Sequence, residues 1–275
     1  MKYSVKLLAL FYLSCLSSLF GQSENSLQPV KEFSINSTIL NEDRTCLISL
    51  PDSYHDAHNN MSYPLIILLD GATFFKTATG TVHFMSSRIN RNYLMPETII
   101  VAIENIDRER DFTVTKLKTK RPNTMGGGNN FLDFIEKELI PYVDHRYRTL
   151  HHRTLIGHSL GGLLTLNAYM DEHRNFDAFL CIDPSIWWDE ETMKRKTEMV
   201  SSSCLKKKIY MATANQGEAN YARNKKRHDR LYALLNSKSN EPLQFKLEYF
   251  EHENHRSVPL LALYNGLRFL NNENE

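Results

Sequence analysis

The fold of this chain is decided by the stretch Thr154-Leu155-Ile156-Gly157-His158-Ser159-Leu160-Gly161-Gly162-Leu163. An apolar run leads into it, a serine stands between two glycines as Gly-x-Ser-x-Gly, and a helix-compatible run follows. The spacing reflects crowding, because a serine on a sharp strand-to-helix turn leaves no room for side chains at the flanking glycine positions. Since the motif stands between a strand-like and a helix-like run, we interpret Ser159 as an exposed nucleophile on such a turn.

Short apolar runs bounded by turn residues recur along the chain, which is typical of strands buried on both faces. These runs are 64–69, 98–103, 154–156, 179–182 and 209–212. Helix-like segments alternate with them, notably 130–139, the run after Ser159, and 258–270. Such alternation predicts an α/β fold with a mostly parallel, doubly wound sheet. We expect antiparallel strands at the N-terminal edge, formed by 33–40 and 44–50, and expect 245–250 near the other edge.

Composition and charge indicate how many domains the chain has and which partners it is not expected to bind. The chain has 275 residues, 41% of them hydrophobic, which suits one large domain, assigned to residues 33–275. Its 33 Lys and Arg balance 32 Asp and Glu, so no nucleic-acid partner is expected. The spacing of the four cysteines resembles no metal site, and we predict no metal.

The N-terminal residues have the pattern of a targeting signal. Two lysines precede the apolar stretch 7–20, and a small-residue boundary follows at Gly21, so residues 1–21 are interpreted as a signal peptide and 22–32 as a linker. The apolar stretch is short for a membrane span. We therefore expect a secreted or periplasmic protein without stable membrane insertion, with a retained anchor as the alternative.

A serine nucleophile needs a histidine base, which a carboxylate orients. In strand-turn-helix sites of this kind the chain order is serine, acid, histidine. The histidines that follow Ser159 are His173, His228, His252 and His255. The last two lie in the loop beyond the final strand, where the base belongs, and His255 is favoured over His252 because it comes just before the closing helix.

The acid is expected in the loop after the strand 209–212. Glu218 is the only carboxylate in the loop 213–218, so it is assigned the orienting role. Asp183, after the preceding strand, and Asp229 are the alternatives.

Two backbone N–H groups must stabilise the oxyanion of an acyl-transfer intermediate. One is expected from Leu160, directly after the nucleophile. The other is expected from Gly71 and Ala72, in the loop that follows the strand ending at Leu69.

Substrate contacts are expected from two segments. The loop 105–128 is long, polar and rich in Arg and Lys, and we take Arg110 within it as a substrate-binding residue, with a mobile surface loop as the alternative. Trp187 and Trp188 follow the strand 179–182, so they are candidates either for lining a pocket or for packing in the core.

Several segments together resemble the putative-esterase family of α/β-hydrolases, which includes siderophore esterases and the esterase D group. Leu69-Asp70-Gly71 is similar to the family's oxyanion-loop segment, and 108–113 resembles a stretch of the siderophore-esterase branch. Further similar segments are 131–142, 184–189 and 255–260, the last of which supports His255. The resemblance spans roughly residues 33–270.

The resemblance implies an α/β-hydrolase fold and a serine carboxylic-ester hydrolase without a cofactor. Siderophores, acylated sugars and simple acyl esters are all open as substrates, so the partner is a small-molecule or glycan-linked ester. Val114 and Arg256 depart from the family pattern and bear on the substrate. An acyltransferase that uses the same residues with an alcohol acceptor is the main alternative, and a non-catalytic binding protein is a third hypothesis.

Overall fold

The computed structural model describes residues 31–88, 91–119, 122–171 and 174–272. The predicted signal peptide and most of the predicted linker lie outside these residues. The first described residue already belongs to a strand, β1 (Lys31–Ser37), which begins two residues before the start expected for it.

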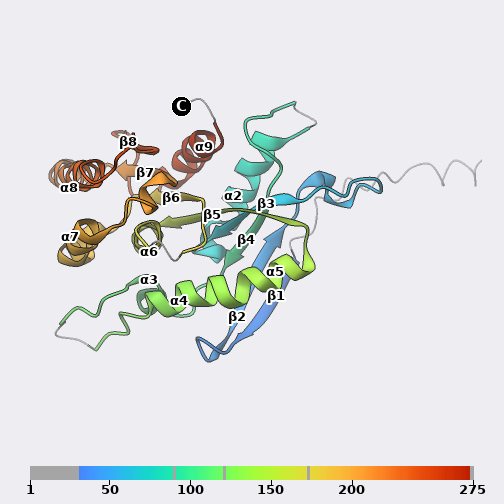
Figure 1. Ribbon diagram of the computed structural model, residues 1–275, viewed down its shortest axis with the longest axis horizontal. Helices are drawn as coiled ribbons and strands as arrows, with labels where there is room; N and C mark the ends of the chain where they lie inside the picture. The colour runs from blue at the N-terminus through green and yellow to red at the C-terminus, as the bar shows by residue number, and fades with distance from the viewer. Residues whose placement is uncertain (1–30, 89–90, 120–121, 172–173, 273–275) are drawn as a thin grey trace, which may run out of the picture.

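Within the described residues, eight strands form one twisted sheet in the order β1-β2-β4-β3-β5-β6-β7-β8 (Figure 1). β1, β2 and β4 pair antiparallel, and every pair from β4 to β8 is parallel, which confirms the predicted sheet and its antiparallel N-terminal edge. β8 lies at the opposite edge, as its alternating sequence predicted. The strands after β1 are Glu42–Ser49, Tyr63–Leu68, Ile99–Ile103, Thr149–His158, Ala178–Ile182, Lys208–Ala214 and Phe245–Phe250.

Helices cover both faces of the sheet. One face carries α2 (Gly71–Ser86) and α9 (Val258–Asn271). The other face carries α3 (Arg108–Phe112), α4 (Gly128–Phe134), α5 (Ile140–Arg146), α6 (Leu160–Tyr169), α7 (Glu190–Met199) and α8 (Glu218–Asn236) (Figure 1). Short helical turns complete the path: η2 (Asp52–His55), η3 (Ile135–Leu139), η4 (Ile186–Asp189) and η5 (Cys204–Lys206).

The two helical layers explain why the strand sequences are apolar without interruption. In β3 and just beyond it, Leu65, Ile67 and Leu69 pack into the core under α4–α6, whereas Ile66 and Leu68 pack under α2 and α9. Successive side chains point to opposite faces of a strand, so a strand between two layers must be apolar at every position.

The predicted helix at 130–139 is part of a longer helical stretch. It runs from Gly128 to Arg146 through α4, the single π-helical turn η3 and α5. The segment 105–128, expected as a loop, contains the short helix α3. Within the described part of the chain, no helix is both long and apolar enough to cross a bilayer.

The topology reverses direction at β3, and this reversal positions the site. The chain leaves β3 through α2 to β4 on one side, then crosses back to β5 on the other side. In open α/β sheets, ligands bind at the carboxyl ends of the strands beside such a switch point. The segments that leave β3, β5, β6 and β7 therefore border the expected ligand site.

Candidate active site

Ser159 occupies the sharp turn that its motif predicts. It directly follows β5, precedes α6, and adopts φ 60° and ψ −116°, outside the regions that L-residues favour. A Cβ on Gly157 would overlap the carbonyl oxygen of Gly161, which explains the glycine two positions before the serine. The Ser159 N–H donates to the carbonyl of Ile182 (2.9 Å), so the turn is bonded to the end of β6.

Three neighbouring strands are each followed by a non-glycine residue with a positive φ. Asp70, Ser159 and Asp183 have φ values of 57°, 60° and 40°, and each lies just past the end of β3, β5 or β6. Sparsely populated backbone conformations at non-glycine residues store strain and cluster at functional sites. Three of the five such residues with positive φ in the described part of the chain thus lie at these strand ends, and the other two are Asn41 and Arg91.

His255 lies in the loop between β8 and α9, and its Nδ1 is 2.5 Å from Oδ2 of Asp183. Asp183 is 2% exposed, and its Oδ1 accepts from the N–H of Ala214 (3.0 Å) while its Oδ2 also accepts from Nε2 of Gln216 (2.6 Å). A carboxylate held by these donors accepts the Nδ1 proton of His255, which leaves the lone pair of Nε2 free. The His255–Asp183 pair thus has the tautomer of a general base.

Glu218, the expected acid, is not brought to His255. It is the exposed first residue of α8, where a negative side chain is stabilised by the helix dipole. The loop after β7 supplies donors to Asp183, through Ala214 and Gln216, rather than a carboxylate of its own. Asp183, weighed as an alternative in the sequence, is the carboxylate that contacts His255.

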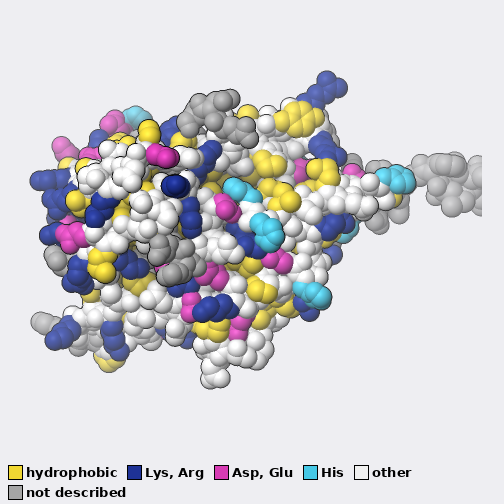
Figure 2. All heavy atoms as spheres, in the orientation of Figure 1, with side chains coloured by type: hydrophobic (Ala, Val, Ile, Leu, Met, Phe, Trp, Pro, Cys, Tyr) yellow, Lys and Arg dark blue, Asp and Glu magenta, His cyan; other side chains and the backbone are white. Residues whose placement is uncertain are grey.

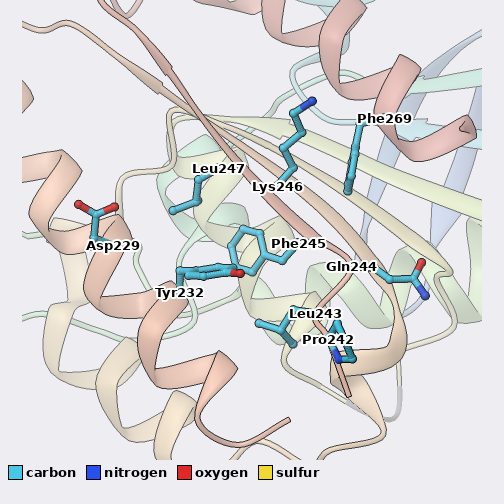
Figure 3. A pocket seen from close by; sticks show the side chains of 9 residues that line it. All are labelled: Asp229, Tyr232, Pro242, Leu243, Gln244, Phe245, Lys246, Leu247 and Phe269. Carbon is cyan, nitrogen blue, oxygen red and sulfur yellow. The ribbon is translucent and has the colours of Figure 1, made fainter. Parts of the chain in front are cut away.

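Asp229, the other alternative, lies elsewhere. It accepts a hydrogen bond from the hydroxyl of Tyr249 and lines a hollow of about 900 Å³ along β8. Figure 3 shows its carboxylate on α8, set apart from the side chains of Phe245 and Phe269 that line the same hollow. Neither Ser159 nor the His255–Asp183 pair lines this hollow, so its size does not mark the active site.

The residue before the serine binds the loop that carries His255. Nε2 of His158 lies 2.8 Å from the carbonyl oxygen of His255, so Nε2 carries the proton and donates. The two imidazole rings lie 4.4 Å apart, and the ring of Phe74 contacts His158 edge-on at 5.3 Å. Desolvation, with the nearby His255, lowers the pKa of His158 to about 4, so it stays neutral near pH 7. The side chain of His158 therefore joins the serine turn to the histidine loop.

The hydroxyl of Ser159 has a partner at the end of the neighbouring strand. Its Oγ lies 3.2 Å from Oγ of Ser185, and the N–H of Ser185 donates to the carbonyl of Ser159 (3.0 Å). Ser185 follows Asp183 by two residues, so the same short segment contacts both the serine and His255. The segment 183–185 therefore contacts Ser159 through Ser185 and His255 through Asp183.

The three residues expected to supply oxyanion N–H groups all begin helices. Leu160 is the first residue of α6, and Gly71 and Ala72 open α2. The first N–H groups of a helix have no partner within it, and the helix dipole adds positive potential there. A Cβ on Gly71 would lie 2.8 Å from the carbonyl oxygen of Ile103, so only glycine fits at this close approach.

Arg108 connects the segment before α2 with the segment before α6. Its Nε and Nη2 donate to the two carboxylate oxygens of Asp70 at 2.6 and 3.1 Å, and Nη2 also donates to the carbonyl of His158 (3.0 Å). Asn105 donates to the same carboxylate (2.6 Å). The sequence alone did not single out Arg108, although it lies in the segment 108–113 that carried part of the family resemblance.

Arg110, the residue expected to bind substrate, is engaged elsewhere. Its guanidinium donates to both carboxylate oxygens of Glu42 (3.0 and 2.6 Å) and to Asp111 (2.7 Å). Asp111 in turn binds the fully buried Arg44. The Arg110 side chain thus ties α3 to β2 through ion pairs.

The two tryptophans differ in their surroundings. Trp187 is half exposed and lines a hollow of about 330 Å³ together with residues of α8. Trp188 is partly buried and packs against the core. The sequence left open whether these residues line a pocket or pack in the core, and the structure shows Trp187 in a pocket and Trp188 against the core.

Among the residues that the structure describes, no group of His, Cys, Asp and Glu is arranged to hold a metal.

Comparisons with known proteins agree with this architecture. The family model described as putative esterase matches residues 37–258. Ferri-bacillibactin esterase BesA of Bacillus subtilis (strain 168) is 28% identical over 226 residues, which cover 75% of this chain and 78% of that protein. A siderophore triacetylfusarinine C esterase of Aspergillus fumigatus is 36% identical over 135 residues, 46% of this chain and 45% of that protein.

A solved structure extends the similarity to three dimensions. The IroE-like serine hydrolase from Shewanella oneidensis superimposes with a TM-score of 0.80 at 31% identity, covering 88% of this chain and 80% of that one. The fold, the matched length and the family model agree. The chain belongs to the putative esterase family and is a carboxylic ester hydrolase.

Proposed function

We propose that the protein cleaves its ester through an acyl-enzyme formed on Ser159, with His255 as general base and Asp183 as the orienting acid. The observation that carries the proposal is the 2.5 Å contact between Nδ1 of His255 and Asp183, beside a serine held on a strained turn. In this proposal Asp183 takes the role that the sequence assigned to Glu218.

The steps follow from the donors and acceptors. The Ser159 hydroxyl turns from Ser185 toward Nε2 of His255, gives up its proton and attacks the ester carbonyl. The N–H groups of Leu160 and of the Gly71–Ala72 turn bind the developing oxyanion. His255 then protonates the leaving alcohol, and water activated by the same nitrogen releases the acid and restores the serine.

The test uses a chromogenic ester and a matched pair of variants, Ser159→Ala and Ser185→Ala. Wild type is expected to hydrolyse p-nitrophenyl butyrate, and Ser159→Ala to lose that activity while its circular dichroism and melting temperature persist. Ser185→Ala removes the neighbouring hydroxyl and is the control, with a much smaller expected loss. Turnover by Ser159→Ala at the wild-type rate would refute the mechanism.

We further propose siderophore esters as the substrate class. The support is that the relatives named above are esterases of ferri-bacillibactin and triacetylfusarinine C. Chromatography of products from these two compounds, beside an acetylated or feruloylated sugar, tests the class. Preferential cleavage of the sugar ester would replace the proposal with a glycan-linked substrate.

The remaining alternatives are weaker. The acyltransferase uses the same groups, and neither the family model nor the named relatives favour it. Product analysis with a competing alcohol present separates it from hydrolysis. Family membership argues against a non-catalytic binding protein.

We propose export of the protein on the basis of residues 1–21. The apolar stretch after two lysines supports a cleaved signal peptide and a secreted or periplasmic location. Intact-mass measurement of the protein recovered from its native compartment tests the proposal, because cleavage after Gly21 has a defined mass. An uncleaved N-terminus would contradict it.

A further inference from the structure

A hollow beside the His255–Asp183 pair has the chemistry of an anion site. It measures about 330 Å³ and is lined by six residues, here called the arginine pocket: Trp187, Gln216, Asn220, Arg223, Asn224 and Arg227. Gln216 belongs to this lining and also donates to Asp183 (2.6 Å). A ligand in the arginine pocket therefore lies one side chain away from the proposed catalytic acid.

The charge of the pocket is only partly balanced. Arg227 lies 3.3 Å from a carboxylate oxygen of the half-exposed Glu190. Arg223 bonds to the amide oxygen of Asn220, and the described residues give it no carboxylate partner. Figure 2 shows that Lys and Arg side chains gather over α7 and α8, with acidic side chains between them. Within the described part of the chain, the pocket thus keeps the guanidinium of Arg223 available to an anion.

The remaining lining suits a substrate with a flat group. Trp187 lines the pocket and is 50% exposed, so its indole is accessible to a ligand there. The amide oxygens of Asn220 and Asn224 accept hydrogen bonds from Arg223 and Arg227, so these two asparagines hold the guanidinium groups that line the pocket. A guanidinium binds carboxylates and similar oxyanions through paired hydrogen bonds, and an indole packs on flat or apolar groups.

We propose that the arginine pocket binds an anionic group of the ester substrate, with Arg223 as its specificity-determining residue and Trp187 as its packing surface. The inference rests on the proposed function, because it names the class of ester that the Ser159 site accepts. It predicts a preference for anionic esters over neutral esters of equal length.

Kinetics on a matched ester pair test the preference. The neutral ester is p-nitrophenyl hexanoate, and the anionic ester is mono-p-nitrophenyl adipate, whose carboxylate is too far from the ester carbonyl to close a five- or six-membered anhydride. In Arg223→Gln, the ratio of kcat/KM for the anionic to the neutral ester is expected to fall about tenfold, the effect of losing one charge-assisted hydrogen bond. Arg230→Gln is the control, because Arg230 lies on the same helix, is exposed, and does not line the pocket.

Each result has a defined meaning. A fall of the ratio in Arg223→Gln but not in Arg230→Gln supports the proposal. An unchanged ratio in Arg223→Gln, or an equal fall in both variants, overturns it while leaving Ser159-dependent hydrolysis intact.

A binding measurement separates this inference from the proposed function. The chain has two tryptophans, at 187 and 188, so its tryptophan fluorescence reports on this region. Titration of Ser159→Ala with phenyl hydrogen adipate is expected to change the fluorescence, and adding Arg223→Gln to weaken binding about tenfold. Binding without any wild-type hydrolysis would sink the proposed function alone, whereas equal affinity in both variants would overturn the inference alone.

Discussion

Replacing Asp183 by Asn tests which carboxylate orients His255. In the structure Oδ1 of Asp183 accepts from the buried N–H of Ala214, and Oδ2 accepts from both Gln216 and His255. An asparagine has one oxygen, and the buried N–H of Ala214 retains it. The amide NH₂ then faces the N–H at Nδ1 of His255, so two donors meet and neither has an acceptor.

The expected fall in kcat follows from the tautomer that His255 adopts beside the asparagine. To accept from the new amide, His255 must move its proton from Nδ1 to Nε2, and Nε2 then cannot take the serine proton. The mismatch costs roughly 1–3 kcal/mol as an unpaired buried polar group. Loss of the carboxylate charge that stabilises the imidazolium adds to it, so kcat is expected to fall about 10³–10⁴-fold, or roughly 4–5.5 kcal/mol.

The assay is initial-rate hydrolysis of p-nitrophenyl butyrate, with folding checked by thermal melting. Glu218→Gln is the matched control, because Glu218 is exposed at the start of α8, and its kcat is expected within about twofold of wild type. The reasoning is refuted if Asp183→Asn keeps about a tenth of the activity while folded. It is also refuted if Glu218→Gln loses as much activity as Asp183→Asn.

Three further predictions concern the histidines and the serine turn. His158→Phe keeps an aromatic ring but loses the hydrogen bond to the carbonyl of His255, so kcat is expected to fall about tenfold. The melting temperature is expected to fall by an amount that corresponds to roughly 1 kcal/mol of stability. Unchanged kinetics would contradict the positioning role of His158. Burial lowers the pKa of both His158 and His228 to about 4, so the unfolded chain binds their protons first as pH falls below about 6.5. Urea titrations should therefore give a free energy of unfolding lower at pH 5 than at pH 7 by roughly 2 kcal/mol per histidine, and equal values would refute this. Gly157→Ala places a Cβ against the carbonyl oxygen of Gly161 and is expected to cost about 3 kcal/mol of stability; a normal melting temperature would show that the turn can relax.

The sheet was predictable because its signals are local. A strand between two helical layers must be apolar throughout, so the runs containing Leu65–Leu68 and Phe179–Ile182 are recognisable in the sequence. Strand lengths were harder to predict. β5 begins at Thr149, five residues before the predicted run, because its first five residues are polar except for the exposed Leu150 and so form no apolar run.

The acid and the arginines depend on distant pairings that local patterns do not contain. Chain order placed the acid after β7, yet that loop supplies the donors Ala214 and Gln216, and Asp183 after β6 contacts His255. Likewise, Arg108 and Arg110 are two residues apart on one helix, so they point in different directions. Only the fold reveals that Arg108 reaches Asp70 while Arg110 reaches Glu42.

The positive φ of Ser159, the proposed nucleophile, lowers the stability of the folded protein. Glycine adopts φ 60° and ψ −116° without the penalty of a Cβ, a difference of roughly 1–3 kcal/mol at such positions. A Ser159→Gly protein would therefore be inactive yet more stable than Ser159→Ala. Selection for stability alone would therefore favour glycine at position 159, whereas the proposed mechanism requires the serine hydroxyl there.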